Sequence, residues 1–83
     1  MKKEIYSFAE LDVGHIYKLV GKNIKKYRKA KKMTSAELAE KINFSHGFLR
    51  QIESGSSGIT FSLTFLYKVS KVLEVNIDNF FKE

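Results

Sequence analysis

Residues 34–55, TSAELAEKINFSHGFLRQIESG, constrain the fold more than any other part of this chain, because they have the pattern of two short helices joined by a sharp turn. Thr34 and Glu37, three residues later, have the form of a capping box, in which two side chains satisfy free N–H groups at a helix start. A helix is therefore expected to begin at Ser35. We expect the motif to span residues 35–54 and the rest of the chain to support it.

The turn and the second helix of this motif have sequence signals of their own. Asn43 interrupts the first helix, and asparagine tolerates the left-handed backbone that a sharp turn requires. Ser45 can cap the second helix, and Gly55 can end it in the left-handed conformation that is common at helix C-termini. The sequence thus predicts a turn at Asn43 and a second helix over residues 45–54.

With about 100° of rotation per residue, the second helix has an apolar face and a polar face. Phe48, Leu49 and Ile52 form the apolar face, which is expected to pack against the first helix of the motif. Arginine and glutamine can make paired hydrogen bonds to guanine and adenine edges, and a short helix fits the major groove of DNA. Both residue types occur on the polar face, which includes His46, Gly47, Arg50, Gln51 and Ser54.

The order of residues in this motif closely resembles the helix-turn-helix of the Cro and lambda-repressor type, also called the Xre family. The resemblance covers roughly residues 20–81. It rests on the order of Leu38, Ala39, Ile42, Phe44, Leu49 and Ile52, followed by Glu53 and then Gly55. It implies an all-α fold, a compact five-helix lambda-repressor-like DNA-binding domain in which the second motif helix is the recognition helix. By position, the residues that it implies for base reading are His46, Gly47, Arg50 and Gln51.

Two positions depart from the family pattern, and so does the loop that follows the motif. Ser35 stands where a glutamine is common, and Asn43 stands where a glycine is common. In the family this loop runs along the phosphate backbone and often carries basic residues, whereas residues 54–62 carry none. Hydroxyl groups and backbone N–H groups would then have to contact the DNA backbone. The candidate hydroxyl groups belong to Ser35, Ser45, Ser56 and Ser57.

The distribution of charge also suits a polyanionic partner. The chain has 15 basic and 9 acidic side chains, a formal net charge of +6. Seven basic residues and no acidic ones lie between Lys22 and Lys32. Such a run can be a solvated helix face or can contact phosphates. Because the motif follows directly, the residues expected to contact the DNA backbone are those near the end of the run: Lys29, Lys31 and Lys32.

Three further helices are expected around the motif. Apolar residues at steps of three and four predict a first helix from residue 12 or 14 to residue 31, in which Gly21 marks a kink or a close contact. Residues 62–73 have the apolar stripe of a fourth helix. Residues 75–81 have the pattern of a short fifth helix capped by Asn76.

Residues 1–13 lie outside the family resemblance and admit three interpretations. Ser7 and Glu10 have the spacing of a capping box, which would begin one short turn of helix. Alternation between residues 4 and 8 also permits a short strand, which could pair across a dimer. The third interpretation is a partly ordered arm. The expected organisation is therefore this N-terminal extension followed by one DNA-binding domain over residues 14–83.

Apolar residues near the C-terminus exceed what a small core needs. They are Phe65, Val72, Phe80 and Phe81. An exposed apolar patch can serve for self-association, and helix-turn-helix proteins commonly place two recognition helices about 34 Å apart on one face of the duplex. These residues thus predict a symmetric homodimer formed by the fourth helix and the C-terminal end. The alternative is that the N-terminal arm covers them.

No pattern in the chain favours an enzyme, a metal site or a cofactor. Eighty-three residues suffice for one small domain, and the absence of cysteine excludes disulfides and thiolate ligands. His15 and His46 have no metal-ligand spacing with each other or with an acid. No apolar run has the length of a signal peptide or a membrane span. We therefore expect a cytoplasmic protein with no catalytic site.

The sequence favours sequence-specific binding of double-stranded DNA by a transcriptional regulator, and a repressor in particular. Basic residues would set the position on the duplex, while Arg50 and Gln51 would discriminate between sequences. Two alternatives remain open at this point. One is a protein-interaction role, for example as an antitoxin, with DNA binding as a second activity. The other is a domain of this fold that has lost DNA binding.

Overall fold

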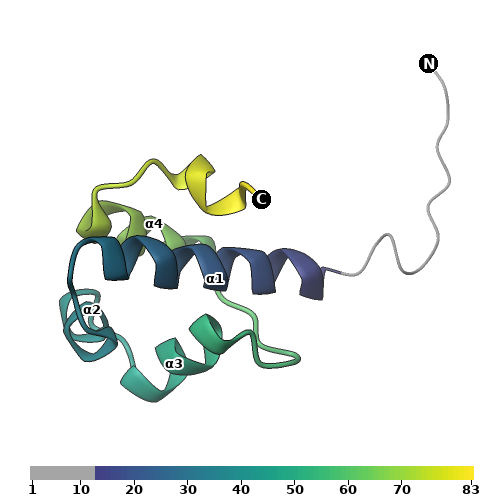
Figure 1. The fold of residues 1–83 in the computed structure, drawn as a ribbon. Helices are drawn as coiled ribbons and strands as arrows, with labels where there is room; N and C mark the ends of the chain where they lie inside the picture. The colour runs from purple at the N-terminus through teal and green to yellow at the C-terminus, as the bar shows by residue number, and fades with distance from the viewer. Residues whose placement is uncertain (1–12) are drawn as a thin grey trace, which may run out of the picture.

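A computed structural model describes residues 13–83, which form four α-helices and one 3-10 helix (Figure 1). The elements are α1 (Gly14–Ala30), α2 (Ser35–Lys41), α3 (His46–Ser54), α4 (Leu63–Leu73) and the 3-10 helix η2 (Ile77–Phe81). The described part of the chain contains no strand, as the all-α fold class requires. The arm, short helix or strand predicted for residues 1–13 lies outside the described residues, apart from Val13, which precedes α1.

The last element corrects the prediction of five α-helices. Ile77–Phe81 is a 3-10 helix, and the Asn76 side chain makes no capping hydrogen bond. The Asn79 amide instead donates to the Asn76 carbonyl oxygen at 2.9 Å, which is the hydrogen bond between residues three apart that defines a 3-10 helix. A segment this short readily takes the tighter 3-10 geometry, because an α-helix gains little from so few hydrogen bonds.

Long-range contacts hold this C-terminal turn against α1. Phe80 is fully buried, and its ring packs edge-on against Tyr27 with 5.7 Å between the ring centroids. The Asn23 side-chain amide donates to the backbone carbonyl oxygens of Phe80 and Lys82, each at 2.8 Å. These two bonds satisfy a buried polar group and tie the end of the described chain to the middle of α1.

One hydrophobic core lies between α1 and the other helices. α1 contacts each of α2, α3, α4 and η2, and Figure 1 shows it passing between α3 on one side and η2 on the other. The buried hydrophobic side chains are Val20, Ile24, Leu38, Ala39, Ile42, Leu49, Ile52, Phe65, Leu66, Val69, Leu73 and Phe80. The predicted packing of the two motif helices through these apolar residues is therefore confirmed.

Gly21 lies where α1 and α3 cross. A Cβ atom added to Gly21 would be 2.0 Å from the backbone carbonyl oxygen of Ile52, far inside van der Waals contact. α1 is a single uninterrupted helix at this position, so a close contact, and not a kink, explains the glycine. The backbones of α1 and α3 can approach this closely only because residue 21 has no side chain.

The structure corrects the predicted dimer surface at two of its four residues. Phe65 and Phe80 are only 2% and 0% exposed, so they fill the core of one subunit and cannot meet a second copy. Phe65 is covered by the rings of Phe44 and Phe61, at centroid distances of 4.9 Å and 5.2 Å. Val72 is half-buried against the core, and Phe81 is exposed. Because α4 contacts α1, α2 and η2, it can use Phe65 within one subunit.

Candidate nucleic-acid interface

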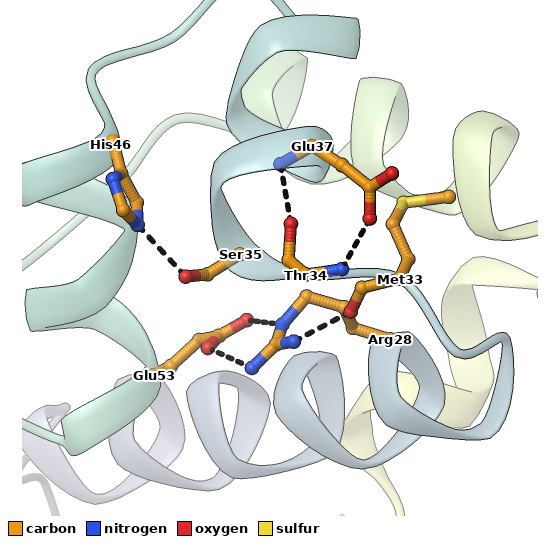
Figure 2. A network of polar contacts seen from close by, with 7 residues as sticks. All are labelled: Arg28, Met33, Thr34, Ser35, Glu37, His46 and Glu53. Atoms are coloured by element: carbon orange, nitrogen blue, oxygen red, sulfur yellow. Dashed lines mark hydrogen bonds and ion pairs between the residues drawn. The ribbon is translucent and has the colours of Figure 1, made fainter.

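The first motif helix, α2, begins with the capping box that the sequence predicts. The Glu37 amide donates to the Thr34 hydroxyl oxygen at 3.1 Å, and the Thr34 amide donates to the Glu37 carboxylate at 2.8 Å (Figure 2). The hydrogen bond from the Thr34 amide favours the ionised carboxylate and lowers the pKa of Glu37. The start of α2 is thus fixed by its own first turn.

The turn between the motif helices also follows the prediction. Asn43 has the left-handed φ of 57°, and the Phe44 amide donates to the Ala39 carbonyl oxygen at 2.8 Å. The Ser45 hydroxyl oxygen then accepts from the Phe48 amide at 3.2 Å and caps α3. At the other end, Gly55 has φ 71° and ends α3 in the left-handed conformation.

α3 has the two faces that its sequence predicts. Leu49 and Ile52 are 0% and 2% exposed and pack into the core. The outer face carries the four candidates for base reading, all of them exposed: His46, Gly47, Arg50 and Gln51. No residue between 13 and 83 makes a hydrogen bond or an ion pair with the side chain of Arg50 or Gln51. Both side chains are therefore available to hydrogen-bond with a partner outside the domain.

His46 and Ser35 are brought together by the motif. The Ser35 hydroxyl oxygen lies 2.8 Å from His46 Nε2, so the first residues of α2 and α3 are hydrogen-bonded to each other (Figure 2). Either atom can donate, depending on the tautomer of the imidazole. Sequence reasoning assigned these residues separately to base and backbone contacts. In the structure they form one hydrogen-bonded pair.

The candidate backbone contacts are spread over three places. Lys29 and Lys32 are exposed near the end of α1, whereas the Lys31 ammonium forms an ion pair with Glu74, which lowers the pKa of that carboxyl. Ser45 is exposed and uses its oxygen as the cap of α3. In the loop, Ser57 is exposed and the Ser56 hydroxyl lies 3.0 Å from that of Ser54.

A buried ion pair that sequence reasoning missed connects α1 to α3. Arg28 donates from Nε and from the guanidinium NH2 group to the two carboxylate oxygens of Glu53, at 2.7 Å and 2.9 Å. Its remaining NH1 group donates to the Met33 carbonyl oxygen at 2.7 Å (Figure 2). The side chains of Arg28 and Glu53 are only 10% and 6% exposed. Together with the Gly21 crossing, this pair fixes α3 against α1.

The position of Arg28 was the sequence signal for this pair. Arg28 follows Ile24 by four residues, which places it on the buried stripe of α1 and not on the solvent side of the basic run. Glu53 follows the core residue Leu49 by four residues, which places it on the buried stripe of α3. A basic and an acidic residue on buried stripes of neighbouring helices are candidates to pair, because an unpaired buried charge is costly.

Two further features of the described residues concern the helices and the loop after α3. No helix within residues 13–83 has the length and the apolar content needed to cross a membrane. The loop between α3 and α4, residues 55–62, has no charged side chain. Gly58 in this loop has φ 78°, a conformation that favours glycine.

Comparison with known proteins agrees with this geometry. A family model described as helix-turn-helix (HTH_3) matches residues 24–80. The HTH-type transcriptional regulator SinR of Bacillus licheniformis is 38% identical over 65 residues, which are 78% of this chain and 58% of SinR. The chain thus spans little more than half the length of this relative.

Two solved structures of SinR are also similar to this chain. The crystal structure of SinR, described as a master regulator for biofilm formation, in complex with DNA has a TM-score of 0.69 and 38% identity, and the match covers 76% of this chain and 98% of that chain. The SinR–SinI protein complex has a TM-score of 0.70 and 39% identity, and the match covers 77% of this chain and 61% of that chain.

Proposed function

Because this chain belongs to the helix-turn-helix family of the Cro and lambda-repressor type, also called the Xre family, we propose that it binds double-stranded DNA sequence-specifically and represses transcription. α3 lies in the major groove in this proposal, and no catalytic step is involved. The observation that carries it is the exposed outer face of α3, where Arg50 and Gln51 have no partner among the described residues. A solved structure of SinR in complex with DNA supports the proposal. In this proposal the protein is cytoplasmic, because it must reach the DNA that it binds.

The residues of the outer face have different roles in this proposal. Arg50 and Gln51 make paired hydrogen bonds to base edges, with guanine and adenine as their favoured partners. His46 reads a neighbouring base with its ring held by Ser35, and Gly47 leaves room for the base edge. Phosphate contacts come from ammonium, hydroxyl and backbone N–H groups around this face. The proposed phosphate ligands are Lys29, Lys31, Lys32, Ser35, Ser45, Ser56 and Ser57.

Alanine variants of the outer face of α3 test this proposal. Arg50→Ala is expected to cost about 1–3 kcal/mol of binding free energy on the preferred DNA site and to relax base preference at one position. Gln51→Ala is expected to do the same at a neighbouring position. Both the loss of affinity and the change in base preference are measured by titrating a set of labelled duplexes, in which each position of the site is changed in turn to each of the other bases. If Arg50→Ala lost the same binding free energy on preferred and on random DNA, Arg50 would be a phosphate ligand and base reading by Arg50 would be contradicted.

We further propose that two copies form a symmetric dimer in solution, which then binds a palindromic site. An apolar groove between α1 and the start of α4 is lined by Ile16, Tyr17 and Phe61 and bordered by Leu63 and Phe81. Leu63 is 72% exposed and Phe81 is 44% exposed, and exposed apolar groups of this size favour burial against a second surface. In this proposal the groove replaces the dimer surface predicted from the sequence. Of the four residues predicted for that surface, only Phe81 is exposed.

Light scattering over a range of protein concentrations tests this pairing. The wild-type chain is expected to approach the mass of a dimer as the concentration rises. Leu63→Lys and Phe81→Lys are expected to remain monomers, because each places a charge in the apolar contact. Thr64→Lys is the control, since Thr64 is exposed on α4 outside this groove. A wild-type chain that stays monomeric at every concentration would rule out pairing in the absence of DNA.

A protein-interaction role is the second function that we propose to test. One observation favours it: SinR, which is similar to this chain, has been solved in a complex with the SinI protein. An antitoxin or another regulator of this fold would use the same apolar groove for a protein partner. In that case Leu63→Lys would abolish capture of the partner while the affinity for DNA stayed unchanged.

A further inference from the structure

Three lysines on α1 form a row beside α3. Lys18, Lys22 and Lys25 follow one another at steps of four and three, which places them within an arc of about 60° on the helix. All three are exposed, and Lys29 continues the same arc. We propose that this lysine row, Lys18, Lys22 and Lys25, binds the DNA phosphate backbone next to the groove that α3 occupies. The inference rests on the proposed function and assigns a second contact surface to it.

The crossing of α1 and α3 places the row beside the base-reading face. Gly21 lies on α1 between Lys18 and Lys22 in sequence, and a Cβ atom there would be 2.0 Å from the Ile52 carbonyl oxygen, so α1 and α3 approach closely next to the row. At one end, Lys18 Cγ is 3.6 Å from the position that a Cβ on Gly55 would take. At the other end, Lys25 borders a shallow hollow that it shares with Gly47, Arg50, Gln51, Glu53 and Ser54. The same hollow is therefore lined by one lysine of α1 and by three of the four candidate base readers.

The charges around the row make it attractive to a polyanion. Glu53, the acidic residue in the hollow, is already neutralised by its buried pair with Arg28. Within residues 13–83, every ion pair uses a basic residue other than the three of the row. Because the ammonium groups have no carboxylate partner there, their full positive charge faces the solvent.

The row also supplies the positive charge that the loop after α3 lacks. Residues 55–62 carry no charge, although they follow the recognition helix directly. Lys18 lies against the start of this loop at Gly55 and lines a depression together with Ser56 and Ser57. A phosphate held by these hydroxyls would therefore find its cation on α1. Lys18 and Lys22 precede residue 24, where the family match begins, so the match does not account for them.

Neutralising the row tests this inference through the dependence of DNA binding on salt. The variant replaces Lys18, Lys22 and Lys25 by glutamine in the full chain. Each lost phosphate contact lowers the slope of log K against log salt by about 0.9, so a loss of roughly 2 to 3 is expected. The base preference measured in competition between duplexes is expected to stay unchanged, because the base readers on α3 are intact.

A triple variant with the same loss of charge is the matched control. It replaces three exposed lysines outside the row, Lys26 on α1 and Lys68 and Lys71 on α4. Lys26 lies over the Tyr27 ring and Lys71 over the Tyr67 ring, so neither borders the hollow beside α3. The control variant is expected to keep the wild-type slope to within about 0.5, since only phosphate contacts release counterions.

The outcomes separate this inference from the proposed function. A reduced slope for the row variant alone supports the inference. Equal slopes for the row variant and the control, with base preference still dependent on Arg50, would overturn the inference and leave the proposed function standing. A wild-type chain that binds no duplex would overturn both. Circular dichroism melting of each variant confirms that the compared proteins are folded.

Discussion

Gly21→Ala is expected to lower the free energy of unfolding by about 3 kcal/mol, the upper part of the range for overpacked cores. The new Cβ would stand 2.0 Å from the carbonyl oxygen of Ile52, and this oxygen belongs to the backbone of α3 and cannot rotate away. Relief requires α1 and α3 to separate, which opens the core around Val20 and Ile24. Urea unfolding followed by circular dichroism measures the change.

Gly47→Ala is the matched control for this prediction. Both glycines lie inside helices, but a Cβ on Gly47 meets only the Ser45 hydroxyl oxygen, at an ordinary 3.8 Å. Alanine is the better helix former by about 1 kcal/mol, so Gly47→Ala is expected to stabilise the free protein. If Gly21→Ala were as stable as the wild type, the close crossing of α1 and α3 would be contradicted.

Arg28→Ala is expected to destabilise the domain by about 3–5 kcal/mol, because it leaves the Glu53 carboxylate buried without its partner. It also removes the donor to the Met33 carbonyl oxygen, which lies in the turn that leads to α2. Arg28→Lys is expected to recover only part of this loss, since one ammonium group cannot make the same three directed hydrogen bonds. Chemical denaturation at constant salt compares the two variants.

A double variant distinguishes the contribution of the ion pair to stability from the cost of leaving one charge buried without a partner. Replacing Arg28 by methionine and Glu53 by leucine together is expected to be far less damaging than Arg28→Ala, because both charges leave the interior. Lys31→Gln, which breaks the exposed pair with Glu74, is the control and is expected to leave stability almost unchanged. A similar loss for Lys31→Gln and Arg28→Ala would contradict a special role for the buried pair.

The helix-turn-helix motif could be predicted from the sequence because its signals are local. The capping box at Thr34, the cap at Ser45, the left-handed Asn43 and the left-handed Gly55 each depend on a few neighbouring residues. Helical periodicity separated Leu49 and Ile52 from the outer face for the same reason. The exposed face of α3, the most important part of the candidate site, follows from these local signals.

Features that depend on distant parts of the chain could not be predicted in this way. Arg28 is one of the seven basic residues in the run that can be a solvated face or can contact phosphates, and its partner Glu53 lies 25 residues away. Phe65 and Phe80 appeared to be surplus, because the number of aromatic rings that a core can hold depends on how the helices meet. The contact between Ser35 and His46 likewise depends on the angle between α2 and α3. Each of these features is a tertiary contact, and the only local signal among them is the place of Arg28 on the buried stripe of α1.

Selection from a random duplex library with the full chain tests the central claim, base reading by α3, most directly. The proposed function predicts an enriched palindromic consensus, with half-sites centred about 10 base pairs apart and with guanine or adenine at the positions that Arg50→Ala and Gln51→Ala relax. Selection with the two variants identifies those positions. Binding that enriches no sequence over the starting library would contradict base reading and leave only contact with the phosphate backbone.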